Sequence, residues 1–431
     1  MSTMHLIATG DAFTTRRLPA DGYPCFNELQ EIIRRHDVSF SNLEMTYHRL
    51  EGTPAAVSGG TWAMADPKCL DDMKRYGFNL FTTANNHTGD YGEGGILATI
   101  RHLREREMVF SGTGANLAEA SRPGYLETGK GRVALVSASA TFHIAGMAGG
   151  QSGEVPGRPG LNPLRFSQTY YVTEDRFRQI RELAKITRVN AYEDYCIQNG
   201  YANPKPEGII NFGIYNFALD ETCRVETSPL ERDITRLEQE IREAKRQADV
   251  VLVSIHAHET DYDDMSTPPG YLKKAAKRCI DAGASAVIGH GPHELRGIEV
   301  YHGGLIFYSL GNFIFQTETV SVQPYEAYDN KGMPIDTRVG EYMDRRSKNG
   351  TTGYQANPNI WRSVMAAWSM EEGRITGVQL YPISLGMHAP RSFRGTPVPT
   401  KDEETLRYLA GLSEPFGTDI RISEGIGYID L

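Results

Sequence analysis

The sequence predicts an α/β protein in which helices pack against layered β-sheets. Short apolar runs alternate with amphipathic segments through the first half of the chain, which is the pattern of alternating strands and helices. Several of these runs end in a residue that can bind a metal ion, which favours a site at the ends of the strands. At 431 residues, the chain is long enough for one large domain or two ordinary ones.

Two helices and a buried strand are predicted in the first third of the chain. Residues 67–76 form the first helix, since Asp66 can cap it and Pro67 suits its first turn. Residues 94–107 form the second, with Ile96, Ile100 and Leu103 on one face. The apolar run at 132–140 reads as a buried strand.

The clearest helix of the chain is predicted at 228–247. Ser228 and Glu231 have the spacing of a capping box, and Pro229 falls at the first helical position. Its apolar face consists of four residues at helical period: Ile234, Leu237, Ile241 and Ala244. The later elements are strands at 249–255 and 286–289, a helix at 272–282, an apolar run at 305–315, strands at 361–369 and 375–385, and a helix at 402–412.

Two segments do not fit this alternation. Residues 143–165 are rich in Gly and Pro, and residues 318–360 are polar with little periodicity. Both are long for connections inside a compact domain, so we expect binding loops or lids there.

Composition excludes several classes of protein. The net charge of −9 and pI near 5.8 argue against a broad nucleic-acid surface, although a local basic pocket for an acidic substrate remains open. No run approaches the roughly 18 apolar residues of a membrane span, and the N-terminus lacks the features of a signal peptide. The five cysteines are scattered without a Cys-x-x-Cys pair, so a reducing cytoplasm is the simplest location.

Metal-type donors follow five apolar runs. Gly289 to His293 supplies two imidazoles directly after a short apolar run. The full donor set is Asp11, Glu44, Asn86, His256, His290 and His293, with His87 beside the asparagine. Two carboxylates, an amide oxygen and three imidazoles suit Mn, Fe or Zn better than an all-oxygen calcium site or a thiolate zinc site. Two divalent ions can be held if one carboxylate bridges them.

These motifs resemble those of the CapA family, the capsule-synthesis, poly-γ-glutamate-associated branch of the calcineurin-like metallophosphoesterase superfamily. The matching motifs are Gly10-Asp11, Asn42-Leu43-Glu44, Ala84-Asn85-Asn86-His87 with Asp90-Tyr91-Gly92, Gly112-Thr113-Gly114-Ala115-Asn116, Ser254-Ile255-His256, Gly289-His290-Gly291-Pro292-His293 and Tyr308-Ser309-Leu310-Gly311-Asn312-Phe313. The resemblance covers roughly residues 4–316 in family order.

The resemblance implies a four-layer α/β/β/α sandwich with a dinuclear metal site at the sheet edge. It implies that the six donors above bind metal, that His87 is the general acid or oxyanion stabiliser, and that Asp90 orients it. Residues 1–316 would form the core, with a loop insertion at about 143–225. Residues 317–431 would complete the same domain with a lid-like loop, strands and a helix.

Three positions depart from the family pattern. The usual Asp-x-His opening of the superfamily is Asp11-Ala12-Phe13 here, and Glu44 stands where the wider superfamily has aspartate. After His256 the chain reads Ala257-His258-Glu259, where CapA-like proteins commonly have Trp-Gly-x-Glu. His258 is therefore a new ligand, a substrate contact or a bystander.

Two further residues are candidate substrate contacts. His143 lies in one of the predicted loops, where it is either structural or a substrate-loop residue. Arg158 lies between Gly157 and Pro159, either in a rigid turn or as a clamp for a phosphate or carboxylate.

The leading interpretation is a metal-dependent hydrolase that uses metal-activated water on a small or oligomeric acidic substrate. The bond cleaved would be a phosphoester or an amide. The alternative is a non-catalytic or auxiliary protein that binds an acidic polymer during its synthesis or export.

Overall fold

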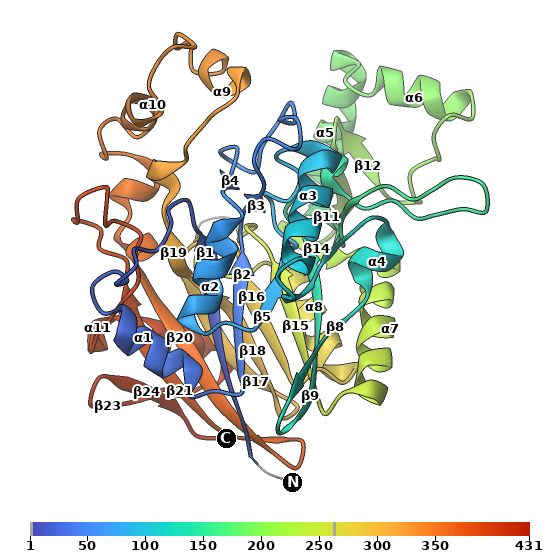
Figure 1. Cartoon of the computed structure of the whole chain (residues 1–431). Coiled ribbons are helices and arrows are strands. Elements are labelled where there is room, and N and C mark those ends of the chain that lie inside the picture. Colours follow the sequence, from blue (N-terminus) through green and yellow to red (C-terminus); the bar gives the residue numbers. More distant parts are fainter. Residues whose placement is uncertain (1–2, 262–263) are drawn as a thin grey trace.

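Two large β-sheets form the centre of the protein, as a computed structural model describing residues 3–261 and 264–431 shows (Figure 1). The ten-stranded sheet contains β1 (Met4–Phe13), β2 (Val38–Leu43), β5 (Leu80–Thr82), β6 (Val109–Ser111), β19 (Asn312–Phe315), β20 (Arg362–Glu371), β21 (Arg374–Ser384), β22 (Val398–Pro399), β23 (Arg421–Ser423) and β24 (Ile426–Ile429). The six-stranded sheet contains β8 (Gly124–Thr128), β9 (Gly131–Ser139), β15 (Val250–His256), β16 (Ala286–His290), β17 (Leu295–Tyr301) and β18 (Gly304–Leu310). The α/β class predicted from the sequence is confirmed.

The two sheets share one apolar core. On β1, Leu6 and Ala8 point into this core, while Ile7 points to the opposite face. On β15, Val250 and Leu252 point inward and Val251 points away. Successive side chains alternate between faces, so these central strands are apolar on both sides.

Helices cover the outer faces of the sheets. Apolar residues of α1 (Phe26–Arg34), α2 (Lys68–Tyr76) and α3 (Gly92–Arg104) share a core with the ten-stranded sheet. Those of α7 (Glu231–Gln247) and α8 (Gly270–Asp281) share a core with the six-stranded sheet. Helix α11 (Glu403–Ser413) packs against β17. The predicted apolar face of the α7 sequence is buried as expected.

The predicted start of this helix was wrong. Helix α7 begins at Glu231, and neither Ser228 nor Pro229 belongs to it. Both residues lie in β14 (Arg224–Pro229), where Ser228 pairs with Ser167 of the antiparallel strand β11 (Phe166–Val172). Pairing with a strand distant in sequence outweighs the local capping pattern, and no side chain caps the helix.

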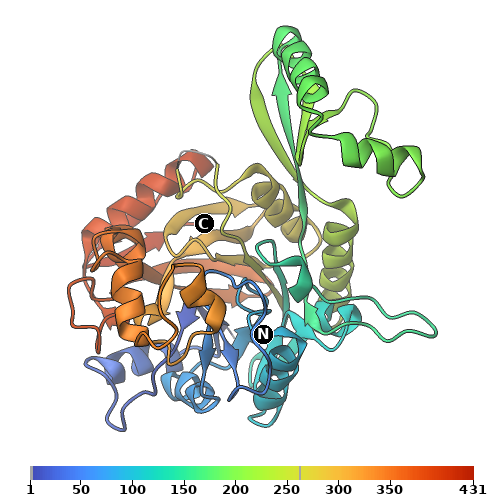
Figure 2. The ribbon, with the colours of Figure 1, turned by 90° about the horizontal axis from the view of Figure 1, so that it is seen from above.

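The segment at 143–225 contains more regular structure than a loop insertion. A four-stranded sheet projects from the body together with helices α5 (Glu174–Thr187) and α6 (Ala191–Gln198), as Figure 2 shows. Its strands are β11 (Phe166–Val172), β12 (Ile210–Phe212), β13 (Tyr215–Leu219) and β14. The division of the chain into domains stays a prediction.

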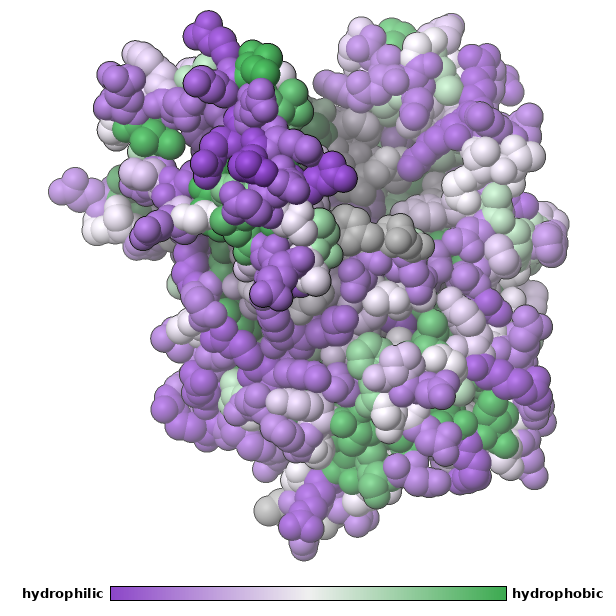
Figure 3. Space-filling view, turned by 180° about the vertical axis from the view of Figure 1, so that it is seen from behind, coloured by the Kyte–Doolittle hydropathy of each residue, from purple (hydrophilic) through white to green (hydrophobic). Residues whose placement is uncertain are grey.

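The second predicted lid segment, 318–360, also contains helices. They are α9 (Tyr325–Asp329) and α10 (Val339–Arg346), which lie on the same side of the body as the ends of β1 and β19 (Figure 1). The face seen from behind is mostly hydrophilic, with apolar residues gathered in a few small areas (Figure 3). Within the described ranges, no helix has the length and apolar character needed to span a bilayer.

Candidate metal centre

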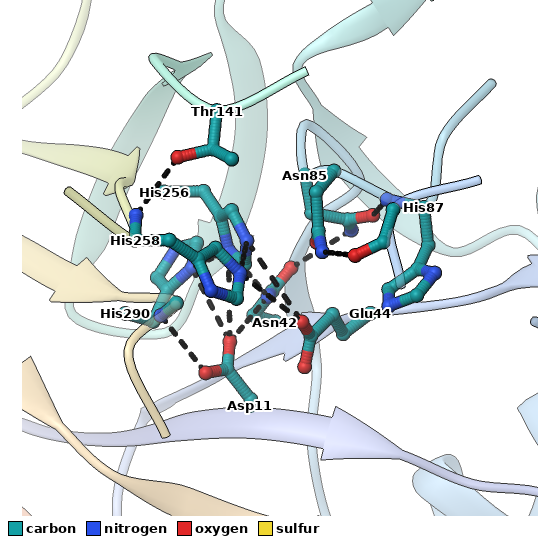
Figure 4. A network of polar contacts seen from close by, with 12 residues as sticks. Asp11, Asn42, Glu44, Asn85, His87, Thr141, His256, His258 and His290 are labelled. Carbon is teal, nitrogen blue, oxygen red and sulfur yellow. Dashed lines mark hydrogen bonds and ion pairs between the residues drawn. The ribbon is translucent and has the colours of Figure 1, made fainter. Parts of the chain in front are cut away.

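The carboxyl ends of parallel strands from both large sheets bring the predicted donors together (Figure 4). Asp11 lies in β1 where the register with β2 and β19 shifts, and Glu44 directly follows β2. His256 and His290 are the last residues of β15 and β16. Carboxyl ends of parallel strands are a common location for ligand sites, because loops there converge on one edge.

Asp11 is a fully buried carboxylate surrounded by donors. Its Oδ1 accepts a hydrogen bond from Nδ2 of Asn42 at 2.6 Å, and its Oδ2 accepts one from the backbone N–H of Gly291 at 2.9 Å. The Nδ1 atoms of His290 and His256 lie 3.4 and 3.7 Å from Oδ1. Burial alone would raise the pKa of Asp11. The hydrogen bond to His290 and the charges of the nearby imidazoles have the larger combined effect and hold this pKa well below its usual value. Asp11 is therefore ionised.

Glu44 is fully buried, and neither of its carboxylate oxygens has a hydrogen-bond partner among the described residues. Three imidazole nitrogens face Oε1, at 3.6 Å for Nε2 of His293, 3.8 Å for His256 and 3.9 Å for His258. Burial raises the pKa of Glu44 well above its usual value, and the negative charge of Asp11 adds to this shift. A buried carboxylate without partners is costly, so the surroundings suit a cation close to Glu44.

Three imidazoles lie side by side next to these carboxylates, with their rings tilted relative to one another. The Nδ1 atoms of His256 and His290 lie 2.8 Å apart, and the Nε2 atoms of His256 and His258 lie 3.1 Å apart. Oγ of Ser254 lies 2.6 Å from Nε2 of His290 and fixes that ring. Burial lowers the pKa values of His256 and His258 well below the usual range. Neutral imidazole, the form favoured here, is the form that binds metal.

His293 enters the centre from a strained turn. Its φ is 61°, and Gly291, two residues earlier, has φ of 121°, where a Cβ atom would lie 3.0 Å from the backbone of Ala257. Nδ1 of His293 donates to Oδ1 of Asn312 at 2.8 Å. That hydrogen bond leaves the lone pair of Nε2 directed towards Glu44, as expected for a ligand whose second nitrogen is held by a neighbour.

Asn86 and His87 lie on the turn after β5. Nδ2 of Asn86 donates to the carbonyl of Gly59 at 2.8 Å, while its buried Oδ1 is unpaired within the described part of the chain. Nδ1 of His87 donates to Oδ2 of Asp90 at 2.7 Å. Asp90 also accepts the backbone N–H groups of Gly59 and Ala63 at 2.9 and 2.8 Å, so its carboxylate is fixed. This arrangement leaves Nε2 of His87 available for chemistry.

The donor atoms form three overlapping groups in which all ligand atoms lie within 4.8 Å of one another: Asp11 with His256 and His290, Glu44 with His256 and His258, and Asp11 with Glu44 and His293. The carboxylates are shared between groups, so the cluster has donors for more than one ion. His258, whose role the sequence left open, lies in one of these groups.

A cavity of about 210 Å³ adjoins the centre. Asn86, His87 and His293 line it, together with residues from the 318–360 segment such as Met343 and Tyr354. His143 and Arg158 do not line it. Nε2 of His143 is 3.1 Å from the carbonyl of Ser58, and Arg158 is exposed, with Nε donating to the carbonyl of Met147. A substrate role for either residue stays a prediction.

Sequence reasoning gave no role to three residues that orient the donors. Each forms a hydrogen bond with one donor: Asn42 with Asp11, Ser254 with His290, and Asn312 with His293. Each belongs to a motif noted in the sequence, and Ser254 lies two positions before His256, on the same face of β15. Strand alternation was therefore the available signal for Ser254.

The fold and this cluster define an α/β protein with a candidate divalent-metal centre between two sheets. Residues 5–317 match the family model described as bacterial capsule synthesis protein PGA_cap. The chain belongs to this family, which is part of the metallophosphoesterase-like superfamily, and the resemblance stated above is confirmed.

Relatives agree with this assignment. An uncharacterized protein, y4sH, of Sinorhizobium fredii (strain NBRC 101917 / NGR234) is 34% identical over 445 residues, covering 99% of this chain and 93% of that protein. The capsule biosynthesis protein CapA of Bacillus anthracis is 25% identical over 322 residues, covering 72% and 60%. The PGA biosynthesis protein CapA of Bacillus subtilis (strain 168) is 48% identical over 159 residues, covering 32% and 37%.

Proposed function

We propose that this protein is a metal-dependent hydrolase that acts on an acidic substrate. The observation that carries the proposal is the buried carboxylate of Glu44, whose two oxygens lack partners within the described ranges while three imidazole nitrogens face one of them. A divalent cation satisfies such a carboxylate, and the mixed oxygen and nitrogen donors suit Mn, Fe or Zn. Two ions are proposed, because Asp11 and Glu44 are each shared between donor groups.

The proposed ligands are Asp11, Glu44, Asn86, His256, His290 and His293, and His258 joins them as a seventh. The unpaired Oδ1 of Asn86 supports its inclusion, since its amide nitrogen is held by Gly59. We also propose that the helices and the two large sheets form the four-layer α/β/β/α sandwich of metallophosphoesterases. The three separate apolar cores support this arrangement.

When bound, divalent ions at such a centre supply Lewis acidity and an activated water at neutral pH. The residues of the chain have the complementary tasks. His87 lines the cavity, and the proposed role of its Nε2 is to give the leaving group a proton. Asp90 accepts the proton on Nδ1 and fixes the orientation of the ring, so the proton given to the leaving group is a second one, held on Nε2.

The substrate is proposed to carry a phosphoester or an amide bond. The first follows the superfamily and the second follows the relatives named for capsule and PGA biosynthesis. Those same names favour a second candidate, an auxiliary protein that binds an acidic polymer without cleaving it. Turnover separates the two, because only the hydrolase converts substrate at a rate that depends on metal.

The test starts from metal-free protein. Mn, Fe(II) or Zn is restored singly, and each form is assayed on phosphoesters and on γ-glutamyl amides, with His290→Ala as the inactive control. We expect one metal to restore turnover on one of the two bond types. Polymer binding without turnover under every metal would favour the auxiliary role instead.

A further inference from the structure

The cavity beside the candidate centre has one permanently charged side chain in its lining, Arg346. Its other described lining residues are apolar, small, amide or hydroxyl residues and the two imidazoles of His87 and His293, with no carboxylate among them. We infer that Arg346 binds an anionic group of the substrate and is the residue that selects acidic substrates at this site.

Helix α10 holds Arg346 in a fixed place. Tyr342 and Met343 of this helix are buried, and Met343 also lines the cavity. Arg391 pairs with Asp344, so the carboxylate nearest in sequence to Arg346 already has a cationic partner. Arg346 is the last residue of α10, where the partial negative charge of the helix end favours a cation.

The guanidinium of Arg346 is exposed, and no carboxylate of the described residues pairs with it. Its neighbour Arg345 differs, because it pairs with Glu341 at 2.6 Å across one helical turn and does not line the cavity. A planar guanidinium with free donors matches the paired oxygens of a carboxylate or a phosphate. The chain thus offers both a candidate anion-binding arginine and a matched control one residue away.

The same cavity is lined by the groups that would do the chemistry. His87, His293 and Asn86 line it, and the ring of Tyr354 contacts that of His293 with centroids 5.1 Å apart. Tyr354 comes from the same segment of the chain as Arg346, and both residues line the cavity. An anion held by Arg346 therefore shares one cavity with the candidate ligands, which is the placement that a bound substrate needs.

This inference rests on the proposed function only for the location of the reaction. The test therefore measures anion binding and does not depend on turnover. Isothermal titration calorimetry with inorganic phosphate and with glutarate is performed on the full chain, both metal-free and metal-loaded. Comparing the two probes distinguishes a phosphate-bearing substrate from a carboxylate-bearing one. We expect Arg346→Gln to weaken the preferred anion about tenfold or more, Arg346→Lys to weaken it less, and Arg345→Gln to stay within about twofold of the parent.

Metal content is measured on each variant, because Arg346→Gln is expected to leave it unchanged. Parent-like affinity in Arg346→Gln, an equal loss in Arg345→Gln, or no binding of either anion by the parent in both forms would overturn the inference. A parent that binds an anion through Arg346 but shows no metal-dependent turnover would overturn the proposed hydrolase and leave this inference intact.

Discussion

His256 and His290 end neighbouring parallel strands in direct register, and their Nδ1 atoms lie 2.8 Å apart. Two nitrogens at that distance either share one proton or direct their lone pairs at a common cation. Asp11, with Oδ1 at 3.4 Å from one and 3.7 Å from the other, supplies the negative charge that a cation requires. The paired strands β15 and β16, with β1 of the other sheet, thus place three metal-type donors without any contribution from a loop.

Asp11→Asn keeps the shape of the side chain but removes its charge. We expect bound metal and turnover to fall together, with metal affinity lower by at least about 100-fold, since even residues that only orient ligands are worth 10- to 100-fold. Elemental analysis after gel filtration measures the metal. Asp194→Asn, at an exposed position on α6, is the matched control and should keep both properties. Full metal content in Asp11→Asn would contradict the ligand assignment.

His87→Ala separates chemistry from metal binding. We expect turnover to fall by about 10²- to 10⁴-fold while metal content is largely kept, because the proposed role of His87 is that of an acid and not of a ligand. Asp90→Asn should lower turnover less, since it leaves the ring in place but removes the negative charge of the group that accepts from Nδ1. Should His87→Ala empty the metal site, its role has been assigned wrongly.

Glu44→Gln is expected to have opposite effects on stability with and without metal. In metal-free protein it removes a buried charge that lacks partners, so the free energy of unfolding should rise by about 1–3 kcal/mol at neutral pH. The gain should shrink in acid, because the raised pKa of Glu44 lets the parent bind a proton in the folded state before the unfolded chain does. Added metal should stabilise the parent more than the variant. Urea unfolding with and without metal measures both effects, and a variant less stable in both forms would contradict the argument.

Ser254→Ala tests whether the hydrogen bond to His290 matters for the site. Oγ lies 2.6 Å from Nε2, so its loss frees the ring to rotate. We expect metal affinity to fall by about 10- to 100-fold with little change in fold. Ser137→Ala is the control, because its hydroxyl is also buried in the six-stranded sheet but has no hydrogen-bond partner among the described residues. Equal metal affinity in the two variants would show that Ser254 does not contribute to the site.

We expect His48 to lower the stability of the protein in acid, independently of the metal centre. It is buried beside Tyr91, and burial lowers the pKa of His48 from 6.5 to about 4. Between these values the unfolded chain binds a proton that the folded protein does not, so the free energy of unfolding falls as the pH drops below 6.5 and levels off below 4. The free energy of unfolding should differ between pH 7 and pH 5, and we expect His48→Gln to reduce that difference by about 2 kcal/mol. Urea unfolding at the two pH values measures it. The exposed His388→Gln should behave like the parent.

The donors were predictable because each follows an apolar run in the local sequence. Strand periodicity alone was enough to place four of them at the carboxyl ends of strands: Asp11, Glu44, His256 and His290. Ser228 shows where this reasoning ends, since its pairing with Ser167 depends on a strand far away in the chain. The projecting sheet was missed for the same reason, because its strands are only half-buried and lack a continuous apolar run.

The anion-binding residue shows a second limit of the sequence. Arg158 stood out because it lies in a Gly- and Pro-rich turn, whereas Arg346 lies in a polar segment with several other charges. Only the packing of α10 over the cavity distinguishes Arg346 from Arg345. Residue type and local pattern do not carry that information.

The donors reach the centre from both large sheets, with Asp11 and Glu44 on one and His256 and His290 on the other. An ion coordinated by both sets would link the two sheets, so metal occupancy would also stabilise their packing. During synthesis, the first half of the chain emerges with only part of the coordination sphere. Metal could then bind fully only after β15 and β16, which carry the histidines, have been synthesised and have packed against the first sheet.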